Sequence, residues 1–367
     1  MRAIFFGLAV TAVALTGGLV ATAQEVDAPH IENARLEKKA LAGPLGAEFK
    51  AWTAKSQGAQ WLGYAVPQMG RDRAMCCGNY NGSWGEDCGR CRLEDKRGGS
   101  NMTSRDEPGS AKLEAPRAIA ILFRAENNRV MKIRMVSLDC SLDAGGLPLL
   151  WLSGVKPAES VELLETFVKG ADLDAHEDEH ASHGALTAIA LHADPAADRA
   201  LESFTRSGER ESLRKQAAFW LGAAREKAGL AVLEKMAKSE PSSEVRAQVT
   251  FALSVSHEPG AVEDMIRMAH DDESTHVRGQ ALFWLAQKAG QKAMGAITGA
   301  IESDPDTDVK KKAVFALSQL PRDEGVPKLI EVAQSNHNRE VRKQAMFWLG
   351  QSHDPRALEF FEKVLSQ

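Results

Sequence analysis

Positive charge is not in excess in this sequence, which has 45 lysine and arginine residues against 50 aspartate and glutamate residues and a formal net charge of −5. A chain with this balance lacks the basic surface that attracts nucleic acid or anionic lipid. Beyond the N-terminus, the sequence has no apolar run that approaches the roughly 20 residues of a membrane span. We therefore expect neither nucleic acid nor a membrane as a partner of the processed chain.

Motifs for nucleophilic catalysis and phosphate binding are absent as well. The sequence has no G-x-S-x-G, no Walker A motif and no G-x-G-x-x-G, which are signatures of α/β-hydrolases, P-loop proteins and dinucleotide-binding folds. We therefore expect no cofactor. We also expect no enzymatic activity, unless it comes from the histidine cluster described below.

The C-terminal half of the sequence does contain a repeat of 32 residues. Each copy opens with an aliphatic residue, continues with a basic residue, and carries phenylalanine six positions later and leucine eight positions later. The opening residues are Leu213, Val245, Val277, Val309 and Val341. A fixed period of this length is typical of a solenoid, whose units are too small to bury their apolar faces alone.

Each copy encodes two helices. In the first, Val245, Val249 and Leu253 recur at the spacing of one helical face. A second apolar rhythm follows, in most copies after a proline-containing turn, and predicts a second helix. An atypical first unit near Ala181 brings the predicted number of units to six. Three positions before each valine stands a residue that can cap the first turn: Ser242, Ser274, Asp306 and Asn338.

This pattern of two antiparallel helices, with an Asp or Ser cap, Val-Arg and then Ala-Leu-Gly, resembles the HEAT repeat, and more closely the short HEAT-like repeat of bacterial phycobilisome lyases. The resemblance covers about residues 181–367. It implies a mainly α fold, a right-handed α–α superhelix, and a scaffold that binds a protein partner through the solenoid surface. Some lyase-type members attach chromophores, but fold-level likeness assigns no activity. The sequence identifies neither the partner nor the oligomeric state.

The first 23 residues predict export. Met1-Arg2 gives a basic start, residues 3–20 are apolar or small, and Ala21-Thr22-Ala23 fits the site that signal peptidase cuts. We therefore expect a signal peptide over residues 1–23 and a mature protein in the periplasm or outside the cell. The alternative is an uncleaved segment that stays as an anchor.

Three predicted segments lie between the signal peptide and the repeats. Residues 24–47 are expected to form a helical leader, residues 48–150 a cysteine-containing β-rich or α+β domain, and residues 151–180 a connecting helix and linker. Within the β-rich domain, strand-like patterns with short turns predict a β-hairpin and a further strand. The hairpin strands are residues 118–124 and 129–137, and the further strand is residues 61–66.

All five cysteines lie in the predicted β-rich domain: Cys76, Cys77, Cys88, Cys91 and Cys140. An exported protein folds in oxidising surroundings, so we expect disulfide bonds, which stabilise small loop-rich domains. In the alternative, the first four cysteines hold a zinc ion, because two of them are separated by a Cys-x2-Cys spacing. The odd total leaves one thiol free or paired with a second molecule.

One cluster matches a zinc-hydrolase motif. His176-Glu177-Asp178-Glu179-His180 fits H-E-x-x-H, in which two histidines one helical turn apart bind zinc and the glutamate activates water, and His183 lies close behind. The surrounding residues favour a solvated acidic turn on the linker, because no long apolar helix flanks the motif. A zinc-dependent hydrolase that uses this cluster is therefore the alternative function.

A file of phenylalanines is the candidate partner surface. At 100° per residue, the phenylalanine lies at about −120° from the opening residue, off the main apolar face. Two interpretations stay open. The rings pack between adjacent units, which the rarity of exposed aromatic stripes favours, or they form a protein-binding ridge. The file consists of Phe219, Phe251, Phe283, Phe315 and Phe347, and Trp220, Trp284 and Trp348 stand beside it in alternate units.

The basic residue after each opening aliphatic residue forms another file, Arg214, Arg246, Arg278, Lys310 and Arg342. Such a file could attract an anionic ligand. We instead expect a ladder of ion pairs with acidic groups of adjacent turns, such as Glu244, Asp306 and Glu340.

Overall fold

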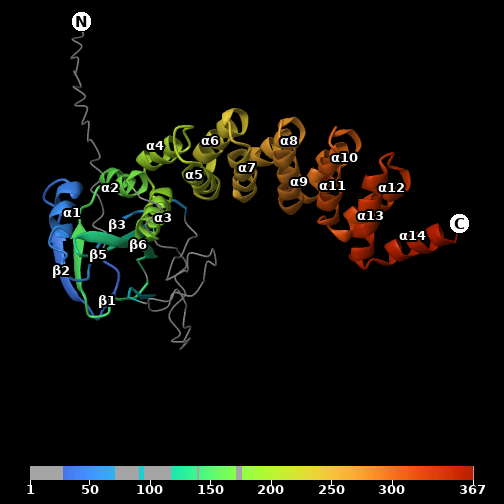
Figure 1. Cartoon of the computed structure of the whole chain (residues 1–367). Helices are drawn as coiled ribbons and strands as arrows, with labels where there is room; N and C mark the ends of the chain where they lie inside the picture. Colours follow the sequence, from blue (N-terminus) through green and yellow to red (C-terminus); the bar gives the residue numbers. More distant parts are fainter. Residues whose placement is uncertain (1–27, 71–90, 95–116, 139, 171–175, 367) are drawn as a thin grey trace, which may run out of the picture.

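The computed structural model describes residues 28–70, 91–94, 117–138, 140–170 and 176–366. Figure 1 shows a sheet with short helices at one end and a long row of helices leading away from it. We call residues 28–170 the sheet region and the helices α3 to α14 the helical array. The predicted signal peptide, residues 1–23, lies outside the described residues.

A five-stranded mixed sheet forms the centre of the sheet region. Its strand order is β2-β8-β3-β5-β6. The strands β5 and β6 form the predicted antiparallel hairpin, β3 is antiparallel to β5, and β8 lies parallel to both β3 and β2. The bounds are Arg35–Ala40 for β2, Gln60–Pro67 for β3, Ala118–Glu126 for β5, Arg129–Ser137 for β6 and Pro148–Ser153 for β8.

The prediction of a helical leader over residues 24–47 is wrong. The described part of this segment forms β1 (Ile31–Glu32) and the edge strand β2, and helix α1 (Leu45–Thr53) begins only at its end. All six residues of β2 are exposed, so the strand has no buried face that a sequence pattern could reveal. Its backbone pairing with β8 fixes the conformation, and its charged side chains suit the open edge of a sheet.

Alternate side chains of the central strands enter two cores. Tyr64, Ile121 and Phe123 belong to the core shared with α1, α2 (Pro157–Lys169) and α3 (His176–Leu191). On the other side, Trp61 and Leu122 pack against a small parallel patch of three short strands. Because the sheet is covered on both faces, β5 is apolar along most of its length. The patch consists of β1, β4 (Cys91–Arg92) and β7 (Leu142–Asp143).

The described part of the array consists of six helix pairs that follow an arch. The first helices of the last five pairs, α5, α7, α9, α11 and α13, lie on its inner side, and the second helices α6, α8, α10 and α12 lie on its outer side (Figure 1). This arrangement confirms the predicted mainly α solenoid with a smaller sheet-containing part. After α3, the bounds are Pro195–Phe204 for α4, Glu211–Ala224 for α5, Glu226–Ser239 for α6, Ser243–Val255 for α7, Gly260–Asp271 for α8, Thr275–Ala289 for α9, Met294–Ser303 for α10, Thr307–Ser318 for α11, Arg322–Ser335 for α12, Arg339–Ser352 for α13 and Pro355–Leu365 for α14, with a 3-10 turn at Gly290–Ala293.

Side-chain caps begin α7, α11 and α13 at three of the four predicted positions. Ser242, Asp306 and Asn338 each accept a hydrogen bond from the backbone N–H of the valine three positions later, at 3.4, 3.2 and 3.4 Å. Ser274 occupies the same position but makes no such bond. A cap of this kind contributes about 1 kcal/mol, so the caps set where the helices begin rather than how firmly the units stack.

Three of the five basic residues, Arg214, Arg246 and Arg278, form the predicted ion pairs, and these pairs are buried, but the predicted acidic partners are wrong. Instead of Glu244, Asp306 and Glu340, the partners are residues two positions before the caps. Each of these carboxylates also accepts the backbone N–H of the capping position. One carboxylate therefore fixes both an arginine and the next helix start. The pairs are Arg214 with Glu240 at 3.1 Å, Arg246 with Asp272 at 2.8 Å and Arg278 with Asp304 at 2.8 Å.

One hydrophobic core runs through both parts of the molecule, from Leu45 of α1 to Phe360 of α14. Backbone hydrogen bonds also connect the sheet region to the array, and we call this connection the joint. Met69 donates to the carbonyl of Leu191 at 2.8 Å, and Ala193 donates to that of Pro67 at 2.9 Å. Residues 176–180, predicted as a turn on a linker, instead form the first turn of α3. The helix extends this far because its later residues are almost all buried against the sheet region and the next helices.

Candidate protein-binding surface

Eight aromatic side chains form a continuous strip along the first helices α5, α7, α9, α11 and α13. Neighbouring ring centroids along the strip are 4.7–5.9 Å apart. Such offset and edge contacts are the arrangements that aromatic rings prefer. We call these rings the aromatic strip; in contact order they are Trp220, Phe219, Phe251, Trp284, Phe283, Phe315, Trp348 and Phe347.

The tryptophans link the phenylalanines of neighbouring units. Phe219 stacks on Phe251 at an interplanar angle of 14°, and Phe283 stacks on Phe315 at 7°. Trp284 then joins these two stacked pairs, because its ring contacts both Phe251 and Phe283. In the units between, the tryptophan position holds a fully buried alanine, Ala252 or Ala316. The alternation of Trp and Ala therefore gives the strip a repeat of two units.

The phenylalanines point away from the core of the array. Buried residues follow each opening residue at four and eight positions, and in all but the last unit also at five positions. These positions lie at about 40°, 80° and 140° around the helix, whereas the phenylalanine lies at about −120°. Because the second helices occupy the outer side of the arch, this direction leads to the inner side (Figure 1). Four of the rings are half-buried and Phe347 is 54% exposed. The rings thus pack between units and still leave an open face.

A file of glutamines runs beside the aromatic strip, and sequence reasoning had not singled it out. The residue three positions after the opening one lies at about −60°, next to the phenylalanine direction. It is a half-exposed glutamine in four of the five units: Gln216, Gln248, Gln280 and Gln344. The amide of Gln216 lies 2.8 Å from Nε2 of His183. Glutamine recurs at one position of the 32-residue motif, and this recurrence could have been used to predict the file from the sequence.

Comparison with known families agrees with this geometry. The sequence profile of HEAT repeats matches residues 199–286, 262–350 and 295–367. The chain is a HEAT-repeat protein. The matches begin within α4 and cover all later helix pairs, including every ring of the aromatic strip. No curated protein matches the sequence.

Two of the solved structures that are similar to part of this chain are the following. One is the complex of CpcE and CpcF of phycocyanin lyase from Nostoc sp. PCC7120, with 21% sequence identity, coverage of 42% of this chain and 99% of that chain, and a TM-score of 0.33. The other is human deoxyhypusine hydroxylase in complex with glycerol, with 16% identity, coverage of 56% and 90%, and a TM-score of 0.30. Scores this low assign no activity to the HEAT-repeat protein.

A buried polar cluster joins the HEAT array to the sheet region. The Tyr64 hydroxyl lies 2.7 Å from Oγ of Ser160, which lies 2.9 Å from Nε2 of His192. On the other side of the imidazole, Nδ1 lies 2.6 Å from the carbonyl of Ala188. Tyr64, Ser160 and His192 are all fully buried. The pairing of serine with histidine is thus structural, because a substrate cannot reach it.

Burial also shifts the titration of this cluster. It lowers the pKa of His192 to about 4 and raises the pKa of the Tyr64 hydroxyl, because a charged form of either group would lose its hydration. His192 is therefore neutral at pH 7. In the neutral ring, a proton on Nδ1 donates to the Ala188 carbonyl and leaves Nε2 to accept from Ser160.

Arg225 makes the next fixed contact between the first and second helix pairs. Its side chain is 1% exposed, and its Nε lies 2.7 Å from Asp198. The remaining N–H groups donate to the carbonyls of Ala190, His192 and Asp194 at 3.3, 2.6 and 3.4 Å. A guanidinium held this way fastens the turn between α5 and α6 to the end of α3.

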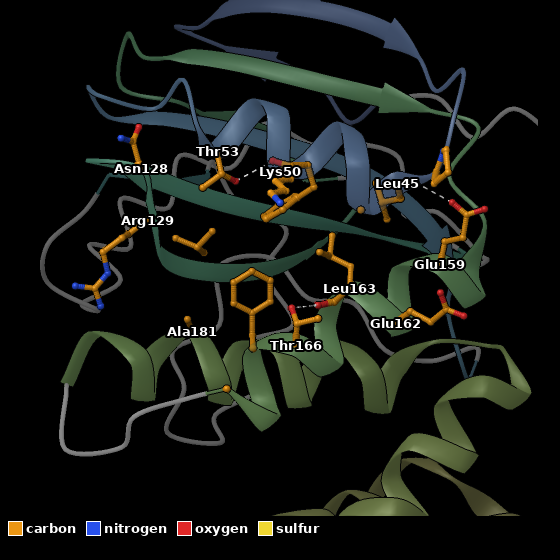
Figure 2. Close-up of a pocket in the computed structure, with 16 residues that line it drawn as sticks. Leu45, Lys50, Thr53, Asn128, Arg129, Glu159, Glu162, Leu163, Thr166 and Ala181 are labelled. Carbon is orange, nitrogen blue, oxygen red and sulfur yellow. Dashed lines mark hydrogen bonds between the residues drawn. The ribbon is translucent and has the colours of Figure 1, made fainter.

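A cleft of about 700 Å³ lies between α1, α2 and the β5–β6 turn in the sheet region. Its wall is largely apolar and includes Leu45 and Leu163. Figure 2 shows Arg129 at one end, and Glu159 and Glu162 at the other. Glu159 already accepts the N–H of Leu45 at 2.9 Å. The cleft has room for an apolar group, but its charged side chains do not meet at one point as those of a catalytic site do.

The histidine cluster partly matches the geometry of its motif. His176 and His180 lie one turn apart on α3, although the side chains of residues 176–179 lie outside those described. The ring of His183 is engaged with Gln216. Among the side chains that the structure describes, no three His, Cys, Asp or Glu residues gather in a way that could hold a metal ion.

Only two of the five cysteines lie within the described residues. Cys91 and Cys140 are fully buried beneath the sheet, and both are disulfide-bonded. Cys76, Cys77 and Cys88 lie outside the described residues, so the pairing of the five cysteines stays a prediction. Within the described part of the HEAT-repeat protein, no helix combines the length and the apolar character needed to cross a membrane.

Proposed function

We propose that this HEAT-repeat protein is an exported, non-enzymatic scaffold that binds a protein partner along the aromatic strip. One observation carries the proposal: eight rings contact one another without a break across five units and keep an open face on the inner side of the arch. HEAT repeats suit a protein-interaction role, because stacked units present an extended surface.

The physical properties of the strip support binding. Aromatic side chains bring a large apolar area with few rotatable bonds, which is why they dominate the energetics of protein interfaces. Here the rings already pack against one another, so binding costs little further side-chain ordering. The glutamine file beside them can donate to and accept from a partner backbone. The strip therefore combines apolar anchors with hydrogen-bonding groups.

Export is the second part of the proposal. It is supported by the basic start, the apolar stretch and the small-residue cleavage pattern over residues 1–23. The disulfide-bonded state of Cys91 and Cys140 suits an oxidising compartment. Sequencing the N-terminus of protein from the periplasmic or secreted fraction tests it. We expect Gln24 as the first residue, and an intact Met1 would contradict export by cleavage.

Variants of the strip test the binding role. Phe283→Ser and Phe347→Ser remove an internal ring and the most exposed ring, and Leu36→Ser is the control, since Leu36 is a 40% exposed apolar residue of β2. A partner is first captured with the intact chain, and its affinity for each purified variant is then measured. We expect both strip variants to weaken binding at least tenfold, which corresponds to about 1.4 kcal/mol.

Circular dichroism separates binding from folding in this test. If Phe283→Ser unfolds the chain, Phe347→Ser still decides, because its ring is 54% exposed and contributes little to the core. Wild-type affinity in both folded variants, or an equal loss of affinity in the Leu36→Ser control, would contradict the proposal.

The alternative function is a zinc-dependent hydrolase that uses His176, Glu177 and His180. One feature of the structure supports it, because the two histidines are four residues apart on a helix. This is the spacing at which the zinc ligands of H-E-x-x-H share one face. Casein hydrolysis with and without a chelator tests it. Chelator-sensitive activity that Glu177→Gln abolishes would replace the scaffold proposal with this one.

A further inference from the structure

A lysine side chain connects two neighbouring first helices in the middle of the HEAT array. Lys288, near the end of α9, reaches back to the end of α7, where its Nζ donates to the carbonyls of Ser254 and Ser256 at 2.8 and 2.5 Å. The last carbonyls of a helix have no partner within the helix and carry partial negative charge. The end of α7 therefore binds an ammonium group that the chain itself supplies.

The equivalent place two units later has a serine in the position of this lysine. Ser352 of α13 follows Lys288 by 64 residues, which is the two-unit repeat of the aromatic strip. A pocket of about 220 Å³ lies there, between the ends of α11 and α13 and the start of α12. It is lined by Ser352 and by Ser318 and Leu320, which correspond to Ser254 and Ser256. The array thus contains one ammonium site that its own lysine fills and one matching pocket.

The walls of this pocket suit a flexible apolar stem with a charged end. Leu320, Val326 and Leu329 line it and are 5%, 3% and 1% exposed. Trp348 also lines it, and the face of an indole ring attracts cations. The volume is below the roughly 300–1,000 Å³ of typical small-molecule pockets. The pocket therefore has room for one side chain rather than for a larger ligand.

The charges around the pocket favour a cation. Arg322 lines the pocket and is exposed to solvent, and the next two residues of α12, Asp323 and Glu324, are acidic. The first turn of α12 therefore carries more negative than positive charge. This turn and the end carbonyls of α11 together attract an ammonium group.

We propose that this pocket binds a lysine side chain of the protein partner. The inference rests on the proposed function, because it requires a partner that lies along the aromatic strip. Trp348 belongs to both the strip and the pocket wall, so a partner on the strip at α11 and α13 passes beside the pocket. Its lysine takes the position that Lys288 has two units earlier, with the ammonium group at the carbonyls of Ser318 and Leu320.

Butylammonium, which has the charge and the four-carbon stem of a lysine side chain, tests the pocket without a partner. The chain has seven tryptophans, and Trp348→Phe identifies the indole N–H signal of Trp348 in NMR spectra. We expect butylammonium to shift this signal saturably and butanol, the uncharged control, to leave it in place. Ser352→Lys should abolish the shift, because the new lysine fills the pocket, whereas Ser352→Ala should keep it. No saturable shift, or the same shift with butanol or in Ser352→Lys, overturns the proposal.

The reciprocal change tests the equivalence of the two places. Lys288→Ser should open a pocket at the end of α7, so that butylammonium also shifts the indole signal of Trp284, which it leaves in place in the wild type. Circular dichroism checks that this variant folds. If it unfolds, Ser352→Lys still decides, because it replaces only a half-buried serine.

Partner affinity decides whether the pocket serves the proposed function. We expect Ser352→Lys to weaken partner binding at least tenfold relative to Ser352→Ala. Acetylation of the partner's lysines should weaken its binding to the wild type and have little further effect on Ser352→Lys. If Phe283→Ser and Phe347→Ser weaken binding while Ser352→Lys does not, the proposed function stands and this inference is overturned. Butylammonium binding without any effect of Ser352→Lys on the partner also overturns it, since the pocket then takes a free amine.

Discussion

The helices are held in two different ways, one at the joint between the sheet region and the array, and the other in the interior of the array. Inside the array, one set of contacts recurs every 32 residues: a capped helix, a buried arginine with its carboxylate, and a ring of the strip. At the joint, in which we include the adjoining contact between the first and second helix pairs, each contact occurs once, as in the Tyr64–Ser160–His192 cluster and the hydrogen bonds of Arg225.

The difference bears on how each region tolerates change. The ladder already contains a natural gap, since Lys310 and Asn336 stand where other units have arginine and acid, and Lys310 donates instead to the carbonyl of Glu302 at 2.8 Å. The array remains continuous across this unit. The joint has no second copy of its contacts, so we expect it to be the more sensitive region.

The largest expected effect is that of Arg225→Ala. This change removes a buried guanidinium and leaves Asp198 and three carbonyls without their donor. We expect the free energy of unfolding to fall by about 3 kcal/mol or more. Urea denaturation of the variant and wild type measures it. A loss below about 1 kcal/mol would contradict the claim that the joint depends on single contacts.

The second-largest expected effect is that of acid, which should destabilise the joint. The unfolded chain takes up a proton at His192 near pH 6.5, whereas burial holds the pKa of the folded form at about 4. The contribution of His192 is therefore complete above pH 6.5 and is lost progressively as the pH falls toward 4, by about 3 kcal/mol in all.

Denaturation at several pH values checks this loss. The pH dependence should shrink in His192→Asn and persist in the control His353→Asn, which changes an exposed histidine. An unchanged pH dependence in His192→Asn would assign the acid sensitivity to other groups.

A ladder arginine should matter less than the joint. Arg278→Gln breaks a buried pair with Asp304, and we expect a loss of about 2 kcal/mol, because the carboxylate keeps its bond to the backbone of Asp306. Lys310→Gln, at the same repeat position in the natural gap, should cost about 0.5 kcal/mol or less. Thermal unfolding measures the stability that each variant loses. A loss in Arg278→Gln as small as that in Lys310→Gln would show that the ladder has no stabilising role.

The smallest effect concerns the exposed end of the strip. Phe347→Ala should change stability by about 0.5 kcal/mol or less, since the ring is 54% exposed. Phe251→Ala, whose ring contacts both Phe219 and Trp284, should cost about 1–2 kcal/mol. Equal costs in thermal unfolding would show that the strip does not pack between units.

The same contrast explains what could be predicted from the sequence. The helix pairs were predictable because period, caps and apolar faces are local signals that repeat. The acidic partners of the arginines were not, since a choice between Glu240 and Glu244 depends on how units stack. The fully exposed strand β2 was mistaken for part of a helical leader because its pairing with β8, more than 100 residues away, leaves no mark on its own residues.

The candidate site was predicted only in part. The phenylalanine file was recognised from its period, and its direction off the apolar face followed from helix geometry. Its contact with Trp284 and Trp348 could not be derived, because ring contacts between units depend on the stacking distance and on the small Ala252 and Ala316 beside them. The residues of the joint, Tyr64, Ser160 and His192, gave no signal at all, since they come from three distant segments.

Hydrogen exchange of the full chain, with and without its partner, tests the central claim most directly. If the aromatic strip is the binding surface, the partner should slow exchange in the first helices α7, α9, α11 and α13, while the second helices α8, α10 and α12 on the outer side change little. Protection concentrated on the outer helices, or confined to the sheet region, would contradict the account.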